Sequence, residues 1–193
     1  TDGRRLAMLE QPLESEGVPD GDVILPPKVI AELEKTLEGD NKVRVQLSEA
    51  RAAFEFANTV ITTKLVEGTY PNYRQVVPEG FTRSITIPRG EFAEVLNRVS
   101  VVVSETSAAV TLALNGNEMI VSANSSEFGE AKEPVDVSYE GSPVEIAFNP
   151  VFFGDPLRYL ECDQLIMQFN DEFSPVAISG DEGFLYIVMP MRG

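Results

Sequence analysis

The stretch Ser84-Ile85-Thr86-Ile87-Pro88, together with the pattern that follows it, decides the fold. Alternating polar and apolar residues predict a strand that ends at Pro88, which has no N–H to donate to a neighbouring strand. The next residues predict a helix, because they place on one face Phe92, Val95, Leu96, Val99 and Val102. Three alternating segments then predict strands at residues 108–114, 118–123 and 131–139. The unit expected from this region is therefore one strand, one helix and three strands.

The same order of elements is predicted twice more along the chain. An earlier copy has a strand at 23–25, a helix from Pro26-Pro27 to Gly39, and strands at 43–47, 52–57 and 59–66. A later copy has a strand at 144–148, a helix from Asn149-Pro150, and strands at 164–169, 173–178 and 184–189. Equivalent positions in the three copies are held by Leu25, Ile87 and Phe148. This internal repeat predicts an α+β fold, with helices on one face of antiparallel sheets.

Pro156 departs from the helical pattern of the last copy. A proline inside a helix removes one hydrogen bond and clashes with the preceding turn, at a cost of about 3 kcal/mol. Either the helix kinks at this residue, or Asp155 is the N-cap and Pro156 is the first helical residue. We favour the second interpretation, in which the helix begins at Pro156.

Composition excludes several classes of site. The chain of 193 residues is 43% hydrophobic, contains no histidine and has one cysteine, Cys162. Histidine-dependent triads and metal sites are therefore excluded, no internal disulfide can form, and Cys162 is interpreted as a small core residue. No run of residues is long and apolar enough to span a membrane, so a cytoplasmic protein is expected. We expect no cofactor, no metal and no intrinsic polymerase or nuclease activity.

The formal charge of −16 at pH 7 argues against indiscriminate electrostatic binding to nucleic acid, but it does not exclude DNA as a partner. Acidic residues also suggest a second class of function, an enzyme that uses carboxylates and Mg²⁺. Two groups are candidates for such a site, namely Asp20, Asp22 and Glu32, and Asp155, Glu161 and Asp163. Neither has the ordered ligand spacing of a metal-binding loop. This reading stays open as an alternative.

Three short segments carry a resemblance to a known family. Residues 1–7 read TDGRRLA, residues 70–78 read YPNYRQVVP, and residues 188–192 read VMPMR. They resemble the TDGHRLA, PDYRRVLP and VMPMR segments of the bacterial DNA polymerase III β subunit, the sliding clamp, and they occur in that family's order. Arg4 stands where the family often has histidine, and Gly193 follows Arg192 where leucine or nothing is common. The resemblance implies the DNA clamp fold.

The resemblance also implies an organisation and a binding site. Residues 1–79 would be the second half of a middle domain and residues 80–193 the C-terminal domain, so we expect the chain to be a fragment. A groove for the clamp-binding peptides of polymerase and clamp-loader subunits would be formed by Thr1, Gly3, Arg4, Arg5, Leu6, Pro71, Arg74, Gln75, Val76, Asn149, Phe152, Phe173, Pro175, Ile187, Met189, Pro190, Met191 and Arg192. Apolar members would bury a leucine or phenylalanine, while the arginines would donate hydrogen bonds to the peptide.

Duplex DNA is the other partner that the resemblance implies. A clamp of this family is a processivity factor in DNA replication, encircles DNA without reading its sequence, and forms a head-to-tail homodimeric ring. The expected helices offer as DNA-facing cations Lys28, Lys35, Arg89, Arg98 and Arg158. Phosphate contacts have no sequence motif, so these residues are named from their charge and their expected place on helices. A peptide-binding module that does not encircle DNA is a further alternative.

We predict that this chain is mostly monomeric in solution. In the family, ring closure joins the first domain of one subunit to the last domain of the next, and such a contact needs two different surfaces. The expected fragment carries one of them. Sedimentation velocity at micromolar concentration measures the outcome, and a stable closed dimer would contradict the prediction.

Overall fold

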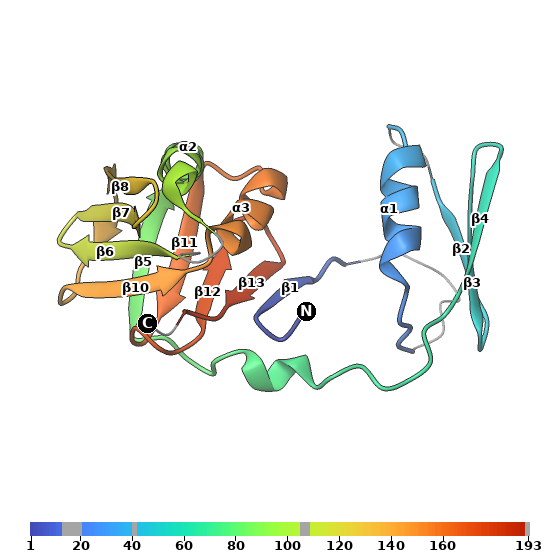
Figure 1. Ribbon diagram of the computed structural model, residues 1–193. Coiled ribbons are helices and arrows are strands. Elements are labelled where there is room, and N and C mark those ends of the chain that lie inside the picture. Colours follow the sequence, from blue (N-terminus) through green and yellow to red (C-terminus); the bar gives the residue numbers. More distant parts are fainter. Residues whose placement is uncertain (13–20, 40–41, 105–108, 192–193) are drawn as a thin grey trace. The chain divides into compact units, whose positions relative to one another are not determined.

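The computed structural model describes residues 1–12, 21–39, 42–104 and 109–191, and the chain divides into two compact units (Figure 1). The larger unit consists of Thr1–Pro12 and Tyr73–Gly193, and the smaller unit of Leu13–Asn72. The first residues of the chain therefore belong to the same unit as the last. None of the helices in the described part of the chain is both long and apolar enough to cross a membrane.

The smaller unit contains one helix and one antiparallel sheet. Helix α1 is Pro27–Thr36, and the sheet has the order β2-β3-β4, formed by Arg44–Leu47, Arg51–Phe56 and Thr59–Lys64. Val29 and Leu33, four residues apart on one face of α1, pack with Ala52, Phe54 and Phe56 of the sheet. This helical face and the alternating face of β3 thus form a small core.

The prediction of a strand at residues 23–25 is wrong. Ile24 accepts one backbone hydrogen bond from Val66 (2.9 Å), but the segment forms no ladder within the described residues. Pro26 and Pro27 follow directly and have no N–H groups to extend the pairing. A β-propensity pattern makes a strand only where another strand lies alongside it.

The larger unit contains two antiparallel sheets. The six-stranded sheet has the order β1-β13-β12-β11-β5-β9, formed by Arg5–Leu9, Phe184–Val188, Val176–Ser179, Gln164–Phe169, Arg83–Pro88 and Ser138–Tyr139. The four-stranded sheet has the order β10-β6-β7-β8, formed by Val144–Phe148, Val110–Asn115, Glu118–Ser125 and Gly129–Asp136. Two short 3-10 helices, η1 and η2, cover Tyr73–Val76 and Ser100–Val102.

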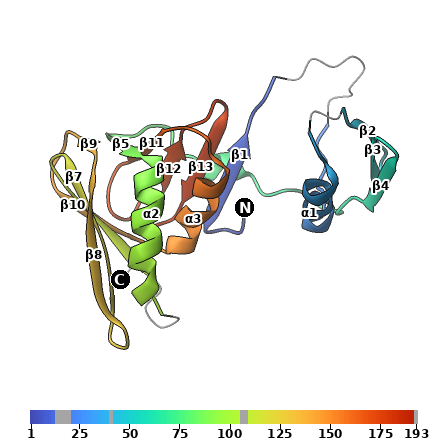
Figure 2. The same cartoon turned by 90° about the horizontal axis from the view of Figure 1, so that it is seen from above.

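Helices α2 (Arg89–Val99) and α3 (Pro150–Tyr159) lie side by side in the larger unit (Figure 2). Phe92 of α2 and Phe153 of α3 meet edge to face, with ring centroids 5.7 Å apart, and Phe153 makes a similar contact with Phe148 at 4.7 Å. One continuous hydrophobic core contains these rings and buried residues from both sheets. The expected repeat of strand, helix and three strands is confirmed as β5-α2-β6-β7-β8 and β10-α3-β11-β12-β13.

Two expected strands are shorter than the sequence pattern indicated. The strand expected at 131–139 is divided between β8 and β9, because Val137 donates to the carbonyl of Asn117 and the chain then leaves β7 to pair with β5. The strand expected from residue 173 begins at Val176, since the Asp171 carboxylate accepts hydrogen bonds from the backbone N–H groups of Phe173 and Ser174. Residue 108, the expected start of β6, lies outside the described residues.

The prediction that α3 begins at Pro156 is also wrong. The helix begins at Pro150, and the Asn149 side chain caps it by accepting a hydrogen bond from the N–H of Val151 (3.0 Å), so Pro156 lies inside the helix. Burial of Phe153 and Leu157 on the core face, each of order 1.5 to 3 kcal/mol, offsets the cost of about 3 kcal/mol for the interior proline. Tertiary packing therefore outweighs the local preference.

We predict that Phe92→Ala lowers the free energy of unfolding of the larger unit by about 3 to 5 kcal/mol, because it leaves a cavity where a ring with no exposed surface made aromatic contacts. Urea titration followed by tyrosine fluorescence measures this change, since Tyr73, Tyr139, Tyr159 and Tyr186 all lie in that unit. Phe128→Ala is the matched control, because Phe128 is 58% exposed. Equal losses for the two variants would contradict the assignment of the core.

Candidate functional site

The end of the chain is fixed in place by main-chain hydrogen bonds on both sides of Pro190. The N–H of Met189 donates to the carbonyl of Arg4 (2.9 Å), and the N–H of Met191 donates to the carbonyl of Ala147 (2.7 Å). Pro190 has no N–H, so the ladder of β13 cannot continue through it. Residues 189–191 therefore run from the start of β1 to the end of β10 and present their side chains outside the sheet.

These residues form one wall of a pocket with a volume of about 330 Å³. We call it the tail pocket, and its lining residues are Arg4, Asn149, Phe152, Met189, Pro190 and Met191. All six were expected in the groove from sequence, and they come from both ends of the chain and from the start of α3. The Asn149 oxygen is used in capping α3, which leaves its amide nitrogen as a donor, while Phe152 and the methionines supply apolar surface.

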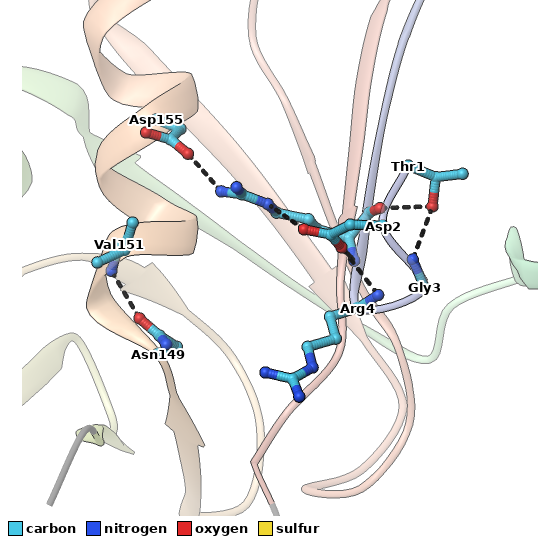
Figure 3. Close-up of polar contacts among 8 residues, drawn as sticks. Thr1, Asp2, Gly3, Arg4, Asn149, Val151 and Asp155 are labelled. Atoms are coloured by element: carbon cyan, nitrogen blue, oxygen red, sulfur yellow. Dashed lines mark hydrogen bonds and ion pairs between the residues drawn. The ribbon is translucent and has the colours of Figure 1, made fainter. Parts of the chain in front are cut away.

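A turn at residues 1–5 places Arg4 in this pocket (Figure 3). The Asp2 carboxylate accepts hydrogen bonds from the N–H groups of Arg4 (3.0 Å) and Arg5 (3.1 Å), and the Thr1 hydroxyl donates to the Arg5 carbonyl (2.7 Å). The hydrogen bond from the Arg4 N–H is the main reason that the pKa of Asp2 lies below its usual value. Gly3 has a φ of +81°, a conformation that glycine adopts without strain. In Figure 3 the side chain of Arg4 points away from Asp155.

Arg5, the first residue of β1, does not line the tail pocket. Its guanidinium forms ion pairs with Asp2 (3.0 Å) and Asp155, and it lies over the ring of Phe152 at 4.6 Å from the centroid. Partial burial disfavours its charge, but the hydrogen bonds to Asp155 and Asp2 outweigh this and raise the pKa of Arg5. Arg5 and Thr1 line a second pocket of about 410 Å³, whose walls include Asp155, Tyr159, Phe184 and Tyr186.

An apolar cluster lies on the face of β1 opposite to Arg5. Leu6 pairs directly with Ile187 of β13, and both are buried together with Ala177 of β12. Partly buried residues that pack against this cluster are Tyr73, Val77, Phe81 and Leu185. Leu6 and Ile187 were expected in the groove. The sequence analysis missed the four packing residues, although the alternation of β13 could have indicated Leu185.

The other expected groove residues are distributed around the cluster or lie elsewhere. Arg74, Gln75 and Val76 are exposed in η1, next to Tyr73 and Val77. Pro175 precedes Val176, which pairs with Val188, so Pro175 lies at the end of the sheet where Met189 leaves β13. Phe173 is 60% exposed in the turn that Asp171 caps. Pro71 is an exposed residue of the smaller unit, and Arg192 lies outside the described residues.

The cations expected to face DNA fall into two groups. The first group, Arg89 and Arg98, binds other groups of the protein. Arg89 donates to the carbonyls of Cys162 (2.6 Å) and Leu157 (3.3 Å), so it holds the end of α3. Arg98 forms three hydrogen bonds with the carboxylate of Glu133, and these bonds lower the pKa of Glu133. The second group has exposed side chains on α1 and α3, and its members are Lys28, Lys35 and Arg158.

The carboxylates that suggested a magnesium site have other surroundings. Asp155 is paired with Arg5, and Asp20 lies outside the described residues. No group of three or more cysteine, aspartate or glutamate side chains in the described segments is arranged to hold a metal ion. Cys162 is partly buried against the main core, as expected, and burial raises the pKa of its thiol. The sequence analysis missed the pairing of Asp155 with Arg5, because the two residues are 150 positions apart.

We predict that Gly183→Ala loosens β1 from β13. Gly183 has a φ of +76°, and a Cβ atom there would lie 2.0 Å from the carbonyl oxygen of Glu10, beside the hydrogen bond from Glu10 N–H to Gly183 (2.9 Å). The free energy of unfolding should fall by more than the roughly 1 to 2 kcal/mol that a left-handed conformation costs an L-residue. Faster hydrogen exchange at Met8 would show the loosening.

Gly116→Ala is the matched control for this variant. Gly116 has a φ of +60°, but a Cβ atom there would meet nothing within 4 Å. The free energy of unfolding of Gly116→Ala should therefore fall only because of the left-handed backbone conformation, and not because of a steric clash. If the two variants lose equal stability and leave exchange in β1 unchanged, the close approach of Gly183 to β1 does not matter for the site.

Comparisons with known proteins show which family this chain belongs to. Residues 1–72 match the family model for the central domain of the DNA polymerase III beta subunit, and residues 74–192 match the model for its C-terminal domain. The beta sliding clamp of Haemophilus influenzae is 36% identical over 195 residues, which cover 100% of this chain and 53% of that protein. The chain spans about half the length of the curated relatives it matches.

Solved structures show the same relationship. A crystal structure of the Caulobacter crescentus beta sliding clamp has a TM-score of 0.93 and 33% identity, over 100% of this chain and 53% of that chain. The sliding clamp from Bartonella birtlesii, bound to griselimycin, has a TM-score of 0.88 and 31% identity, over 100% of this chain and 53% of that chain. The expected clamp fold is thereby confirmed. The chain belongs to the DNA polymerase III beta subunit family.

Proposed function

We propose that this chain is part of a DNA sliding clamp, a non-catalytic processivity factor of a bacterial replicative polymerase. In this function it binds clamp-binding peptides of polymerase and clamp-loader subunits, and the intact protein encircles duplex DNA in the cytoplasm. The observation that carries the proposal is the tail pocket, where Arg4 meets Met189, Pro190 and Met191 from the other end of the chain. Membership of the family supplies the second support.

The chemistry of the tail pocket suits a peptide side chain that is both polar and partly apolar. Arg4 and the Asn149 amide nitrogen are donors, while Phe152 and Met189 offer apolar surface on either side. A glutamine side chain fits this combination, since its carbonyl oxygen accepts hydrogen bonds and its two methylene groups pack against the ring and the thioether. A pocket built only for an apolar group would not need these donors.

The apolar cluster supplies a second, adjacent subsite. Leu6 and Ile187 are buried, whereas Val76 is 45% exposed and Met189 is 37% exposed. These exposed apolar side chains are unfavourable in water, and a leucine–phenylalanine pair of a bound peptide would bury them. A crystal structure of the relative from C. crescentus has PEG bound at a region proposed to tether beta motifs.

The domain division expected from sequence forms part of the proposal. Residues 1–79 would be the second half of a middle domain and residues 80–193 the last domain, and the boundary between the two family models near residue 73 supports this division. Strand β1 would then be a piece of the middle domain that extends the sheet of the last domain through its pairing with β13. The ring would form from two head-to-tail copies of the intact protein.

The proposed DNA contacts rest on the exposed cations Lys28, Lys35 and Arg158. Arg89 and Arg98 are poorer candidates, because their donors already bind carbonyl groups and the Glu133 carboxylate. A few dispersed cations on an acidic protein would neutralise few phosphates. Weak contact of this kind suits a protein that moves along DNA.

The proposed function predicts that Met189→Ala and Leu6→Ala weaken binding of a synthetic peptide containing a glutamine and a leucine–phenylalanine pair by roughly 1 to 3 kcal/mol each, because apolar anchors dominate such contacts. Lys28→Ala is the control, since this residue lies on α1, outside the groove. Titration calorimetry with folded variants measures the differences. If the Lys28 variant loses as much affinity as the other two, or if no variant loses any, the groove assignment is wrong.

A further inference from the structure

Three side chains form a connected group behind the tail pocket. The guanidinium of Arg5 bridges Asp155, with which it forms an ion pair, and Phe152, over whose ring it lies at 4.6 Å. Phe152 and Asp155 are three residues apart on α3, so they lie on the same face of the helix. Phe152 lines the tail pocket, whereas Arg5 and Asp155 do not. The group thus links a wall of the tail pocket to a carboxylate that does not line it.

The helix lacks one main-chain hydrogen bond at Phe152. In a regular α-helix the carbonyl of residue 152 accepts a hydrogen bond from the N–H of residue 156. Here residue 156 is a proline inside the helix, so this donor is missing and the ring of Pro156 crowds that carbonyl. The turn that carries Phe152 therefore lacks one of its own bonds. The Arg5 guanidinium contacts the side chain of this same residue, Phe152.

The planar guanidinium is suited to this task. It can stack on the face of an aromatic ring while its N–H groups bind a carboxylate, which an ammonium group cannot do with the same geometry. Asp2 binds the Nε side of the group at 3.0 Å, so Arg5 is held by one carboxylate from the turn that precedes β1 and by one from α3. Arg5 is therefore held by two carboxylates while its guanidinium lies over the Phe152 ring.

We propose that Asp155 is a positioning residue for the tail pocket, which acts through Arg5 to set the orientation of the Phe152 ring and hence the pocket's selectivity for a glutamine-like side chain. This inference rests on the proposed peptide-binding function. Asp155 does not line the tail pocket, so its effect on that pocket depends on Phe152 and on the peptide side chain that occupies the pocket.

The experiment is a double-mutant cycle measured by fluorescence anisotropy with the glutamine-containing peptide. Asp155→Asn should weaken binding about threefold to tenfold, the range expected for loss of one ordered cation–π contact. Asp155→Glu should restore most of the affinity, because it keeps the carboxylate. Asp136→Asn, on the exposed face of β8, is the matched control and should leave the affinity unchanged.

Two further arms separate positioning from general destabilisation. In a Phe152→Ala background, and with a peptide whose glutamine is replaced by alanine, Asp155→Asn should have no further effect. An equal loss in either arm would overturn the inference. If the original peptide binds and Met189→Ala weakens it, but Asp155→Asn does not, the proposed function stands and the positioning role is wrong.

A readout without peptide keeps the test independent of the proposed function. NMR of the aromatic protons of Phe152 should show altered chemical shifts and faster ring averaging in Asp155→Asn, while Asp136→Asn leaves them unchanged. If the Phe152 signals are the same in wild type and Asp155→Asn, the positioning role is excluded even where no peptide binds. If the signals change and no peptide binds, Asp155 still positions the ring, and the proposed function alone has failed.

Discussion

The antiparallel pairing of β1 with β13 is the interaction on which the site depends. It brings Arg5–Leu9, from the first residues of the chain, alongside Phe184–Val188 near its end. Because side chains alternate along both strands, one pairing creates two different surfaces. Leu6 and Ile187 build the apolar cluster on one face, and Arg5 reaches Asp155 on the other. A shift of register by one residue would exchange these two surfaces and would remove both the cluster and the ion pair.

The repeat could be predicted from sequence because each copy carries its own local signals. Phe92, Val95 and Val99 fall on one face of a helix, and short alternating segments separated by turns follow. Such patterns depend only on neighbouring residues. The strand at 23–25 failed for the opposite reason, since a strand also needs a partner alongside it. Pro156 was misjudged because the burial of Phe153 and Leu157, which holds the helix together, depends on other parts of the chain.

In the candidate site, too, the features that depend on residues far apart in the chain could not be predicted from sequence patterns. The resemblance identified residues of the tail pocket from both ends of the chain, although their contact through Met189 and Arg4 is visible only in the fold. The ion pair of Asp155 with Arg5 could not be predicted from sequence. The two residues are far apart in the chain, and no sequence pattern indicates which distant charges will pair. Arg89 and Arg98 show the converse, since both have the charge expected of a DNA contact but bind carbonyl or carboxylate groups within the protein.

The two main-chain hydrogen bonds on either side of Pro190 have a consequence for engineering. Backbone atoms of Arg4 and Ala147 hold the path of residues 189–191 through these hydrogen bonds. Substitution at 189 or 191 can therefore change the volume and polarity of the pocket while its wall stays in place. Pro190 separates the two positions and cannot form a ladder bond that would draw the tail into the sheet. These two positions are the natural choice for a combinatorial library that varies the volume and polarity of the tail pocket.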